Sequence, residues 1–401
     1  MNPKVSVVVP VYNTSRYLRQ SLESLIHQTL REIEIIVVND GSTDGSDKII
    51  KEYAEKYKNI VTISKKNGGL ASAYNAGQRV AKGEYVGFLD SDDWAEPNMF
   101  EALYNYGHAF NVDVVRSGGV MAETTGRPSR LNIFVPSNKC HKLILNPLDL
   151  PEFVDNHVCQ WASIYKRDFL LQNKIEAPEK PKGLAPDIDF VYQVWVLAKS
   201  FYTLPQAFVH YRLDNPNSDK QSGSKMSFYL LLGHLASRKS LFKLGDKVSP
   251  KMWAQKTYVE FRHLIYEINT RSKKKRFSLI WQVSRLFKEN LKKKLVDKSV
   301  FSEQDWATYR LIANHPILFY LRNITKFYKV TGTVKQEKTT WRYFGIYKSV
   351  EREDSMDVYL FGTLIFRHEK LRPILAQLDG KLNELNQRIA TLSEQVKRGP
   401  F

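Results

Sequence analysis

Cysteine is scarce in this sequence, which has only two thiols in 401 residues, Cys140 and Cys159. Two thiols cannot form the disulfide framework that stabilises small secreted domains, so we expect a reducing compartment and a fold stabilised by its core. Long apolar runs are also missing, and without about eighteen consecutive apolar residues we predict no membrane-spanning helix. The apolar segment at residues 5–12 is short, contains Pro10 and leads into polar residues, so we expect no signal peptide.

Acidic residues are few in the second half of the chain. The formal charge is −1 over residues 1–220 and +19 over residues 221–401, in a total of +18. A near-neutral half suits a small ligand that brings its own cation. A strongly basic half suits an anionic partner, such as a membrane surface, a polyanionic acceptor or a nucleic acid.

Much of the positive charge lies at residues 271–298, which hold eleven Lys or Arg against two acids. Apolar residues recur there at helical spacing: Leu279, Ile280, Val283, Leu286, Phe287, Leu291 and Leu295. A basic amphipathic helix can lie on an anionic membrane, or it can pack its apolar side against neighbouring helices. The sequence leaves both interpretations open.

Apolar strands alternate with helical segments over the first hundred residues. We predict strands at residues 5–10, 34–40, 60–64 and 84–90, with helices at 14–27, 41–57 and 68–83, the last closed by Gly83. This alternation predicts an α/β fold with a mostly parallel sheet and right-handed crossovers. Ligands bind such sheets beyond the carboxyl ends of the strands. Those ends are residues 10–12, 39–40, 65–69 and 90–93.

The rest of the chain divides into further regions by pattern. Residues 150–215 read as a strand and short helix, an amphipathic helix from Pro186 and a last strand, before a polar linker at 214–225. We therefore place an α/β domain at 1–215, a basic helical region at 216–330, a small β-unit at 331–370 and a helix at 371–401.

The C-terminal helix has two series of apolar residues seven apart: Leu371, Leu378, Leu385 and Leu392, and Leu375, Leu382, Ile389 and Val396. This heptad pattern is typical of a two-stranded coiled coil, so we expect a homo-oligomer. The alternative is an amphipathic helix that docks on its own chain.

Three carboxylates follow the fourth predicted strand, in the segment YVGFLDSDDW: Asp90, Asp92 and Asp93. Like charges this close repel one another unless a cation or donor groups hold them. Carboxylates without a His or Cys cluster suit Mg²⁺ or Mn²⁺ shared with phosphate oxygens, rather than zinc. Asp40 reaches the same edge from another strand, which supports this interpretation for Asp90 and Asp92. Asp93 could instead cap the next predicted helix.

Four motifs, in this order and spacing, resemble glycosyltransferase family 2: VSVVVPVYN, EIIVVNDGSTDGS, NGGLASAYNAG and GEYVGFLDSDDW. The likeness is strong over residues 4–100 and extends less sharply to about 215. It implies a GT-A fold for residues 1–215. The implied reaction is inverting and metal-dependent, and moves a sugar from a nucleotide-diphosphate donor, with UDP-sugar the leading choice, to a hydroxyl of a cell-surface polysaccharide intermediate.

The resemblance also implies a cellular setting. The acceptor would belong to a capsule, teichoic acid or lipopolysaccharide intermediate, and would be lipid-linked or polyanionic. The enzyme would then be a cytoplasmic bacterial protein, held peripherally at the inner face of the cell membrane by its basic region.

The resemblance further implies a set of nucleotide-sugar-binding residues: Pro10, Val11, Tyr12, Asp40, Lys66, Asn67 and Asp90. The first three would line the base pocket and Asp40 would accept a hydrogen bond from the base. Asp92, together with Asp90, would bind Mn²⁺ or Mg²⁺, which neutralises charge on the departing diphosphate.

The family's general base usually comes from a Glu-Asp pair just before a Phe at the start of a helix. The corresponding segment of this chain is LAPDIDFVYQ, in which Asp187 corresponds to the Asp of the pair and Pro186 stands in place of the Glu. The resemblance implies Asp187 as the base, with Asp189 as the second choice. Without that role, both would be helix-start carboxylates that interact with the helix dipole.

A second departure from the family is Tyr74, where many relatives carry Arg. If that Arg meets phosphate, this chain must use other groups there, such as Lys65 or Lys66. Asp44 could contact the nucleotide or cap a helix.

Weaker candidates lie later in the chain: Trp161 for sugar stacking, Arg212 for the diphosphate or acceptor, and His157 and His210 in structural roles.

Three other functions are alternatives to the glycosyltransferase that the resemblance implies. A dinucleotide-dependent oxidoreductase lacks support, because PVYNTS rather than a Gly-rich loop follows the first strand. No nucleic-acid-binding module is recognisable in the basic half, so we expect no nucleic acid partner. A noncatalytic nucleotide-sugar-binding scaffold is the main alternative, and the presence of Asp40, Asp90, Asp92 and Asp187 argues against it.

Overall fold

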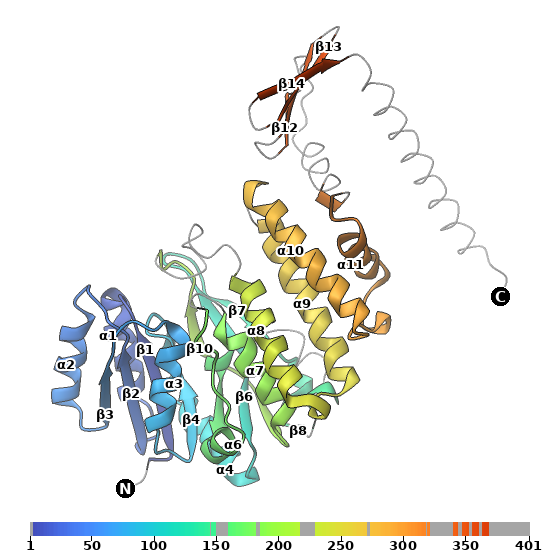
Figure 1. Ribbon diagram of the computed structural model, residues 1–401. Helices are drawn as coiled ribbons and strands as arrows, with labels where there is room; N and C mark the ends of the chain where they lie inside the picture. Colours follow the sequence, from blue (N-terminus) through green and yellow to red (C-terminus); the bar gives the residue numbers. More distant parts are fainter. Residues whose placement is uncertain are drawn as a thin grey trace. The chain divides into compact units, whose positions relative to one another are not determined.

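The computed structural model describes residues 3–144, 146–149, 159–181, 185–216, 229–270, 273–317, 319–320, 340–343, 347–352, 355–360 and 363–368. Contacts divide the chain into two compact units. The first comprises Met1–Arg271 and Lys275–Phe319, and the second Ser272–Lys274 and Tyr320–Phe401. The first unit, coloured from blue to orange in Figure 1, holds the predicted site.

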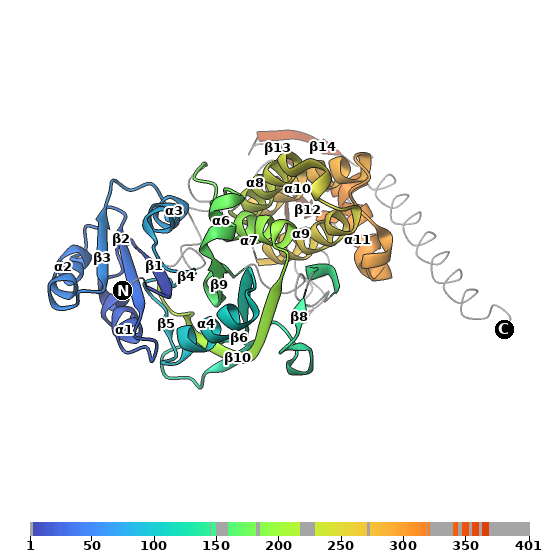
Figure 2. The same cartoon turned by 90° about the horizontal axis from the view of Figure 1, so that it is seen from below.

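Four parallel strands form the N-terminal half of the large sheet, in the order β3-β2-β1-β4. Their bounds are β1 Val5–Val11, β2 Ile33–Asn39, β3 Ile60–Ser64 and β4 Tyr85–Phe88. The connecting helices are α1 Ser15–Ile26, α2 Ser46–Lys56 and α3 Leu70–Val80. Seen from below, α1 and α3 lie on opposite faces of these strands (Figure 2). The predicted alternation and parallel pairing are confirmed here, because β1 and β2 are buried along their whole length and helices cover both faces.

The end of α3 differs from the prediction. The helix stops at Val80 with an extended Ala81 rather than at Gly83. A Cβ on Gly83 would lie 2.5 Å from the backbone nitrogen of Ser6. Gly83 therefore lets the chain approach β1 closely, and it does not cap the helix.

The second half of the sheet is mixed. β9 Ser163–Lys166 runs antiparallel to both β4 and β6 Val114–Glu123, and β10 Phe201–Arg212 runs parallel to β6. Short antiparallel strands add to this framework: β5 Trp94–Ala95 and β8 Leu143–Ile144 on β10, and β7 Arg130–Ile133 on β6. The pairing of β5 with β10 brings the end of β10 beside residues 90–93.

The remaining elements of this region are helices α4 Met99–Phe110, α6 Arg167–Gln172 and α7 Pro186–Leu197, and short 3₁₀ turns at Ser137–Lys139, Pro147–Asp149 and Gln160–Ala162. The predicted strand and short helix after Cys159 and the helix from Pro186 are thus present.

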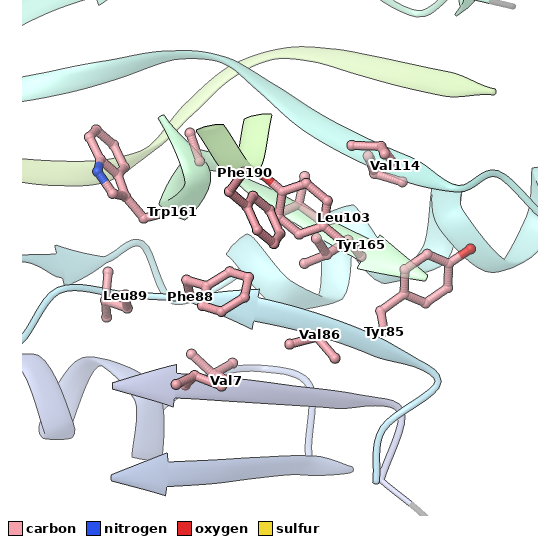
Figure 3. Close-up of a cluster of buried hydrophobic side chains, with 14 of the residues drawn as sticks. Val7, Tyr85, Val86, Phe88, Leu89, Leu103, Val114, Trp161, Tyr165 and Phe190 are labelled. Atoms are coloured by element: carbon pink, nitrogen blue, oxygen red, sulfur yellow. The ribbon is translucent and has the colours of Figure 1, made fainter. Parts of the chain in front are cut away.

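The core joins β4 to α7. Phe88 of β4 meets the ring of Tyr165 at 6.0 Å and that of Phe190 of α7 at 5.6 Å, both edge to face. Figure 3 shows these side chains together with Val7 and Leu103 between the strands and helices. Edge-to-face pairs add to the hydrophobic burial of each ring. The packing therefore fixes the end of β4 relative to the start of α7.

A helical bundle packs against α7 within the same unit. Its helices are α8 Tyr229–Leu244, α9 Pro250–Thr270, α10 Lys273–Lys292 and α11 Glu303–Asn314, with 3₁₀ turns at Gly245–Lys247 and Lys298–Val300. α8 makes extensive contact with α7, and a Cβ on Gly233 would lie 2.7 Å from the carbonyl oxygen of Ala185. α7 is consequently buried on most of its circumference, rather than amphipathic as the sequence predicts.

The apolar side of α10 faces into the bundle. Leu279, Ile280, Val283, Leu286 and Phe287 are buried, and the ring of Phe287 stacks on that of Tyr309 at 4.1 Å. This side is therefore not available to a membrane, and only the exposed basic side remains for one. Among the described residues, no helix combines the length and apolar character that a membrane crossing requires.

The second unit contains a four-stranded antiparallel sheet. Its strands are β11 Thr340–Tyr343, β12 Tyr347–Arg352, β13 Ser355–Leu360 and β14 Thr363–His368, paired in chain order. The predicted C-terminal helix at 371–401, most of the linker at 214–225 and His157 lie outside the described residues.

Candidate active site

Polar residues gather at the carboxyl edge, which we define as the ends of β1, β2 and β4. Asp40 follows β2, and the acidic segment Asp90–Asp93 follows β4. Tyr74, on α3, donates a hydrogen bond from its hydroxyl to Oδ1 of Asp90. Asp187 lies in the first turn of α7, three residues before Phe190, whose ring packs against that of Phe88 at the end of β4. The packing of α7 on β4 thus places the start of α7, with Asp187, against the strand end that leads into Asp90.

Asp40 organises the loop that follows β3. Its buried Oδ1 accepts hydrogen bonds from Lys65 Nζ at 2.7 Å and Gly68 N at 2.9 Å, and its Oδ2 accepts one from Gly69 N at 2.8 Å. Gly69 adopts a φ of +90°, which glycine takes without strain. Asp40 is 2% exposed, so its visible role is to hold the 65–69 loop beside the carboxyl edge.

The other predicted nucleotide-binding residues differ in how far their side chains are exposed. Pro10 and Val11 are buried in β1, so their side chains belong to the core and do not line an open pocket. Tyr12 leaves half of its side chain, 51%, exposed just beyond the strand. Lys66 is exposed and Asn67 is half-buried in the loop that Asp40 holds. Of the predicted base-pocket residues, only Tyr12 offers a side chain to a base.

Asp92 is half-buried, like Asp90. Its Oδ2 accepts a hydrogen bond from Asn215 Nδ2 at 2.7 Å, and its backbone carbonyl accepts one from Arg212 Nε at 2.9 Å. Its Oδ1 accepts none from the residues that the structure describes. Asp92 therefore has an oxygen available for a cation.

Asp93 is a buried structural carboxyl. It is 2% exposed, and its Oδ1 accepts a hydrogen bond from the backbone N–H of Arg212 at 2.7 Å. Burial raises the pKa of Asp93 well above its ordinary value, and the charges of Asp92 and Asp90 raise it further. The predicted capping role is wrong, because α4 begins at Met99 after Asn98.

Asp187 and Asp189 point to different sides of α7, since positions two apart on a helix lie about 200° around its axis. Asp187 is half-buried, and its Oδ1 accepts from the N–H of Ile188 at 3.0 Å. Asp189 is 1% exposed and accepts from Gln193 at 2.8 Å and from Ser240 of α8 at 3.2 Å. Burial raises the pKa of Asp189 to about 6. Asp189 thus faces α8, which removes it as a candidate base.

Arg212 supports the acidic segment from β10. Its guanidinium lies over the rings of Tyr17 at 4.7 Å and Trp94 at 4.8 Å, and donates to Gln20 at 2.6 Å. The sequence suggests Arg212 for the diphosphate or acceptor, whereas here it holds the backbone of Asp92. Its packing between two aromatic rings depends on residues far apart in the chain, and no local signal predicts it.

His210 ties three strands together behind this segment. Its ring stacks on Trp94 at 4.8 Å, and its two nitrogens lie 2.8 Å from carboxylate oxygens of Glu96 and Glu123. Trp161 stacks on Tyr211 at 5.3 Å and is nearly buried, so it belongs to the core rather than to a sugar platform.

Asp44 caps two helices at once. Its Oδ1 accepts from the backbone N–H of Ser46 at 3.0 Å, and its Oδ2 accepts from that of Ser15 at 2.8 Å. Partial burial raises the pKa of Asp44, but the hydrogen bonds from Ser46 and Ser15 outweigh it and lower the pKa to about 2. A groove of about 390 Å³ lies beside it, lined by Asn13, Thr14, Ser15, Arg16, Tyr17, Asp44 and Pro216.

The oxygen ligands at the carboxyl edge suit a single hard cation. The described residues contain no group of three or more His, Cys, Asp or Glu side chains placed for a metal ion. A mononuclear Mg²⁺ or Mn²⁺ site needs only one or two carboxylates when substrate phosphates and water complete the shell. Asp92, with a free oxygen, and Asp90 fit that donor set.

Known proteins share this sequence and architecture. The family model described as Glycosyl transferase family 2 matches residues 6–170. EpsJ of Bacillus subtilis strain 168, described as an uncharacterized glycosyltransferase, is 30% identical over 248 residues, which cover 57% of this chain and 70% of EpsJ. The chain belongs to glycosyltransferase family 2. This family 2 enzyme is also 34% identical over 229 residues to GgaB of the same organism, a minor teichoic acid biosynthesis protein, but spans only 24% of GgaB.

The solved structures confirm the GT-A fold of this glycosyltransferase. The first 349 residues of S. aureus TarS, crystallised with UDP, superpose with a TM-score of 0.60 at 19% identity. The match covers 87% of this chain and 96% of that one. The enzyme is thus a family 2 glycosyltransferase related to enzymes of teichoic acid and polysaccharide biosynthesis.

Proposed function

We propose that this glycosyltransferase is an inverting, metal-dependent enzyme that moves a sugar from a UDP-sugar to a hydroxyl of a cell-surface polysaccharide intermediate. The observation that supports the proposal is the packing of the end of β4, which precedes Asp90, against the start of α7, which carries Asp187, through the rings of Phe88 and Phe190. A donor site and a base from separate elements are what a direct displacement requires. Among the acceptors named above, teichoic acid is favoured by the likeness to GgaB and to a poly(ribitol-phosphate) β-glucosyltransferase.

In the proposed reaction, Asp187 accepts the proton of the acceptor hydroxyl as its oxygen attacks the anomeric carbon. The bond to the diphosphate breaks in the same step, and UDP leaves. Asp92 and Asp90 would hold Mn²⁺ or Mg²⁺, which neutralises the charge on the leaving group when bound. Asp40 keeps the 65–69 loop in place for the nucleotide, with Tyr12 beside it.

UDP with Mn²⁺ should raise the melting temperature of the purified protein. A ligand at one hundred times its Kd stabilises the native state by about 2.7 kcal/mol, which corresponds to several degrees in a protein of this size. Differential scanning fluorimetry with UDP, with NAD and with each plus Mn²⁺ measures this. A shift with NAD but not with UDP would refute the proposed donor class.

The acceptor is proposed to be a lipid-linked or polyanionic glycan, reached from an anionic membrane surface. The exposed side of α10 carries Trp281, 48% exposed, followed by Arg285, Lys288 and Lys292 at spacings of four, three and four. These spacings place all four on one stripe, the basic stripe. An exposed Trp beside cations suits the headgroup region of an anionic bilayer, and such binding would keep the enzyme at the inner membrane face.

Liposome flotation tests the basic stripe. The triple variant Arg285→Gln, Lys288→Gln, Lys292→Gln should bind vesicles of anionic lipid at least about tenfold more weakly. A matched variant, Lys48→Gln, Lys56→Gln, Lys58→Gln, removes exposed charge from the α2 region and should bind normally. Vesicle binding that does not change with salt concentration would contradict the electrostatic account. Equal loss of vesicle binding in both variants would contradict it as well. Loss of binding to a soluble anionic glycan instead would reassign the stripe to the acceptor.

The homo-oligomer predicted from the heptads at 371–401 remains a prediction.

A further inference from the structure

Tyr74 occupies the centre of the proposed site, although its residue type departs from the family pattern. It is 2% exposed on α3, and its ring packs edge-on against Phe88 at 5.1 Å. Its hydroxyl donates to Oδ1 of Asp90. A side chain fixed at both its ring and its hydroxyl can hold one orientation of the Asp90 carboxylate.

The phenol acts here as a neutral donor. A tyrosine hydroxyl ordinarily keeps its proton at neutral pH, because its unperturbed pKa is about 10. Tyr74 therefore restrains Asp90 without neutralising its charge. An Arg at this position would supply a positive charge as well, so the two residues would leave Asp90 in different electrostatic states.

The described cations near the carboxyl edge do not replace that missing charge. Lys65 is paired with Asp40 at 2.7 Å. Arg212 is bound to Gln20 and to the backbone of Asp92, between two aromatic rings. Lys66 and Arg16 are exposed, where water screens their charges. These described cations therefore leave much of the counter-charge of a donor diphosphate to a divalent ion.

We infer that Tyr74 is a positioning residue that aligns Asp90 for the divalent ion, and that its neutral hydroxyl makes UDP binding in this chain strongly dependent on that ion. The inference rests on the proposed function. Beyond that function, we infer that Tyr74 in place of Arg determines how strongly Mn²⁺ binding increases the affinity for UDP.

Isothermal titration of UDP, with and without Mn²⁺, measures this coupling. Tyr74→Phe keeps the ring against Phe88 and removes the hydroxyl. The Mn²⁺-induced gain in UDP affinity should fall by about tenfold, because one hydrogen bond to a charged group is lost. Metal-free affinity should stay within about twofold. Tyr53→Phe, which removes the hydroxyl that donates from α2 to Glu23 of α1, is the matched control and should keep the full gain.

Tyr74→Arg tests the role of charge, because it should change UDP affinity without the ion, which Tyr74→Phe should not. The added charge should raise metal-free UDP affinity and reduce the gain from Mn²⁺. If Tyr74→Phe keeps the full Mn²⁺ gain, or loses affinity equally with and without the ion, the positioning role is overturned. If the unmodified protein binds no UDP under either condition, the proposed function fails instead.

Discussion

Replacing Asp187 with asparagine should lower kcat for sugar transfer by about 10²- to 10⁴-fold, the usual loss when a general base is removed. The amide cannot accept the proton of the acceptor hydroxyl. UDP affinity with Mn²⁺ should stay within about twofold, since Asp187 lies on α7 and not on the strand ends proposed to hold the nucleotide. Steady-state transfer assays paired with UDP titration measure both quantities. Unchanged kcat would eliminate Asp187 as the base.

Asp189→Asn is the matched control, two positions along the same helix. Transfer should persist, because Asp189 faces Ser240 of α8. Since the folded state raises the pKa of Asp189 to about 6, the wild type is relatively most stable below pH 4 and loses stability as pH rises through 6. The asparagine variant lacks that loss, so it should unfold no more easily than the wild type at pH 7. Urea unfolding at pH 4 and pH 7 measures the difference.

Asp92→Asn should abolish most of the dependence of the enzyme on Mn²⁺. The amide oxygen can still accept the hydrogen bond from Asn215, so the fold is expected to persist, but the charge that attracts the cation is gone. We expect transfer to fall at least about 100-fold and UDP affinity in Mn²⁺ to approach its metal-free value. Kinetics over a Mn²⁺ series and UDP titration provide the test.

Asp246→Asn, in the exposed turn after α8, removes the same charge far from the carboxyl edge and should leave these values unchanged. Intact transfer in Asp92→Asn would mean that the acidic segment does not hold the ion.

The local sequence pattern was sufficient to predict the strands and helices that position the candidate site. The strands that end at Val11, Asn39 and Phe88 follow from apolar runs separated by periodic helices. Because parallel strands end at one edge, the convergence of Asp40 and Asp90 follows as well. The same apolar pattern could not show that the side chains of Pro10 and Val11 are buried in β1.

Long-range contacts explain the other differences. Asp93 bonds the backbone of Arg212, 119 positions away, and no local rule separates that role from a helix cap. The burial of α7 depends on α8, and the covered side of α10 depends on Tyr309 of α11. Asp189 differs, because the 100° turn per residue of a helix could have separated it from Asp187 on sequence alone.

The close approach of Gly233 to Ala185 bears on protein engineering. Since α8 presses against the residue that precedes α7, the helices after residue 229 help to hold the segment that carries Asp187. Chimeras that exchange C-terminal halves between relatives to alter acceptor choice would leave that segment without its native support. A graft that carries α7 and α8 as one block preserves this contact across the junction.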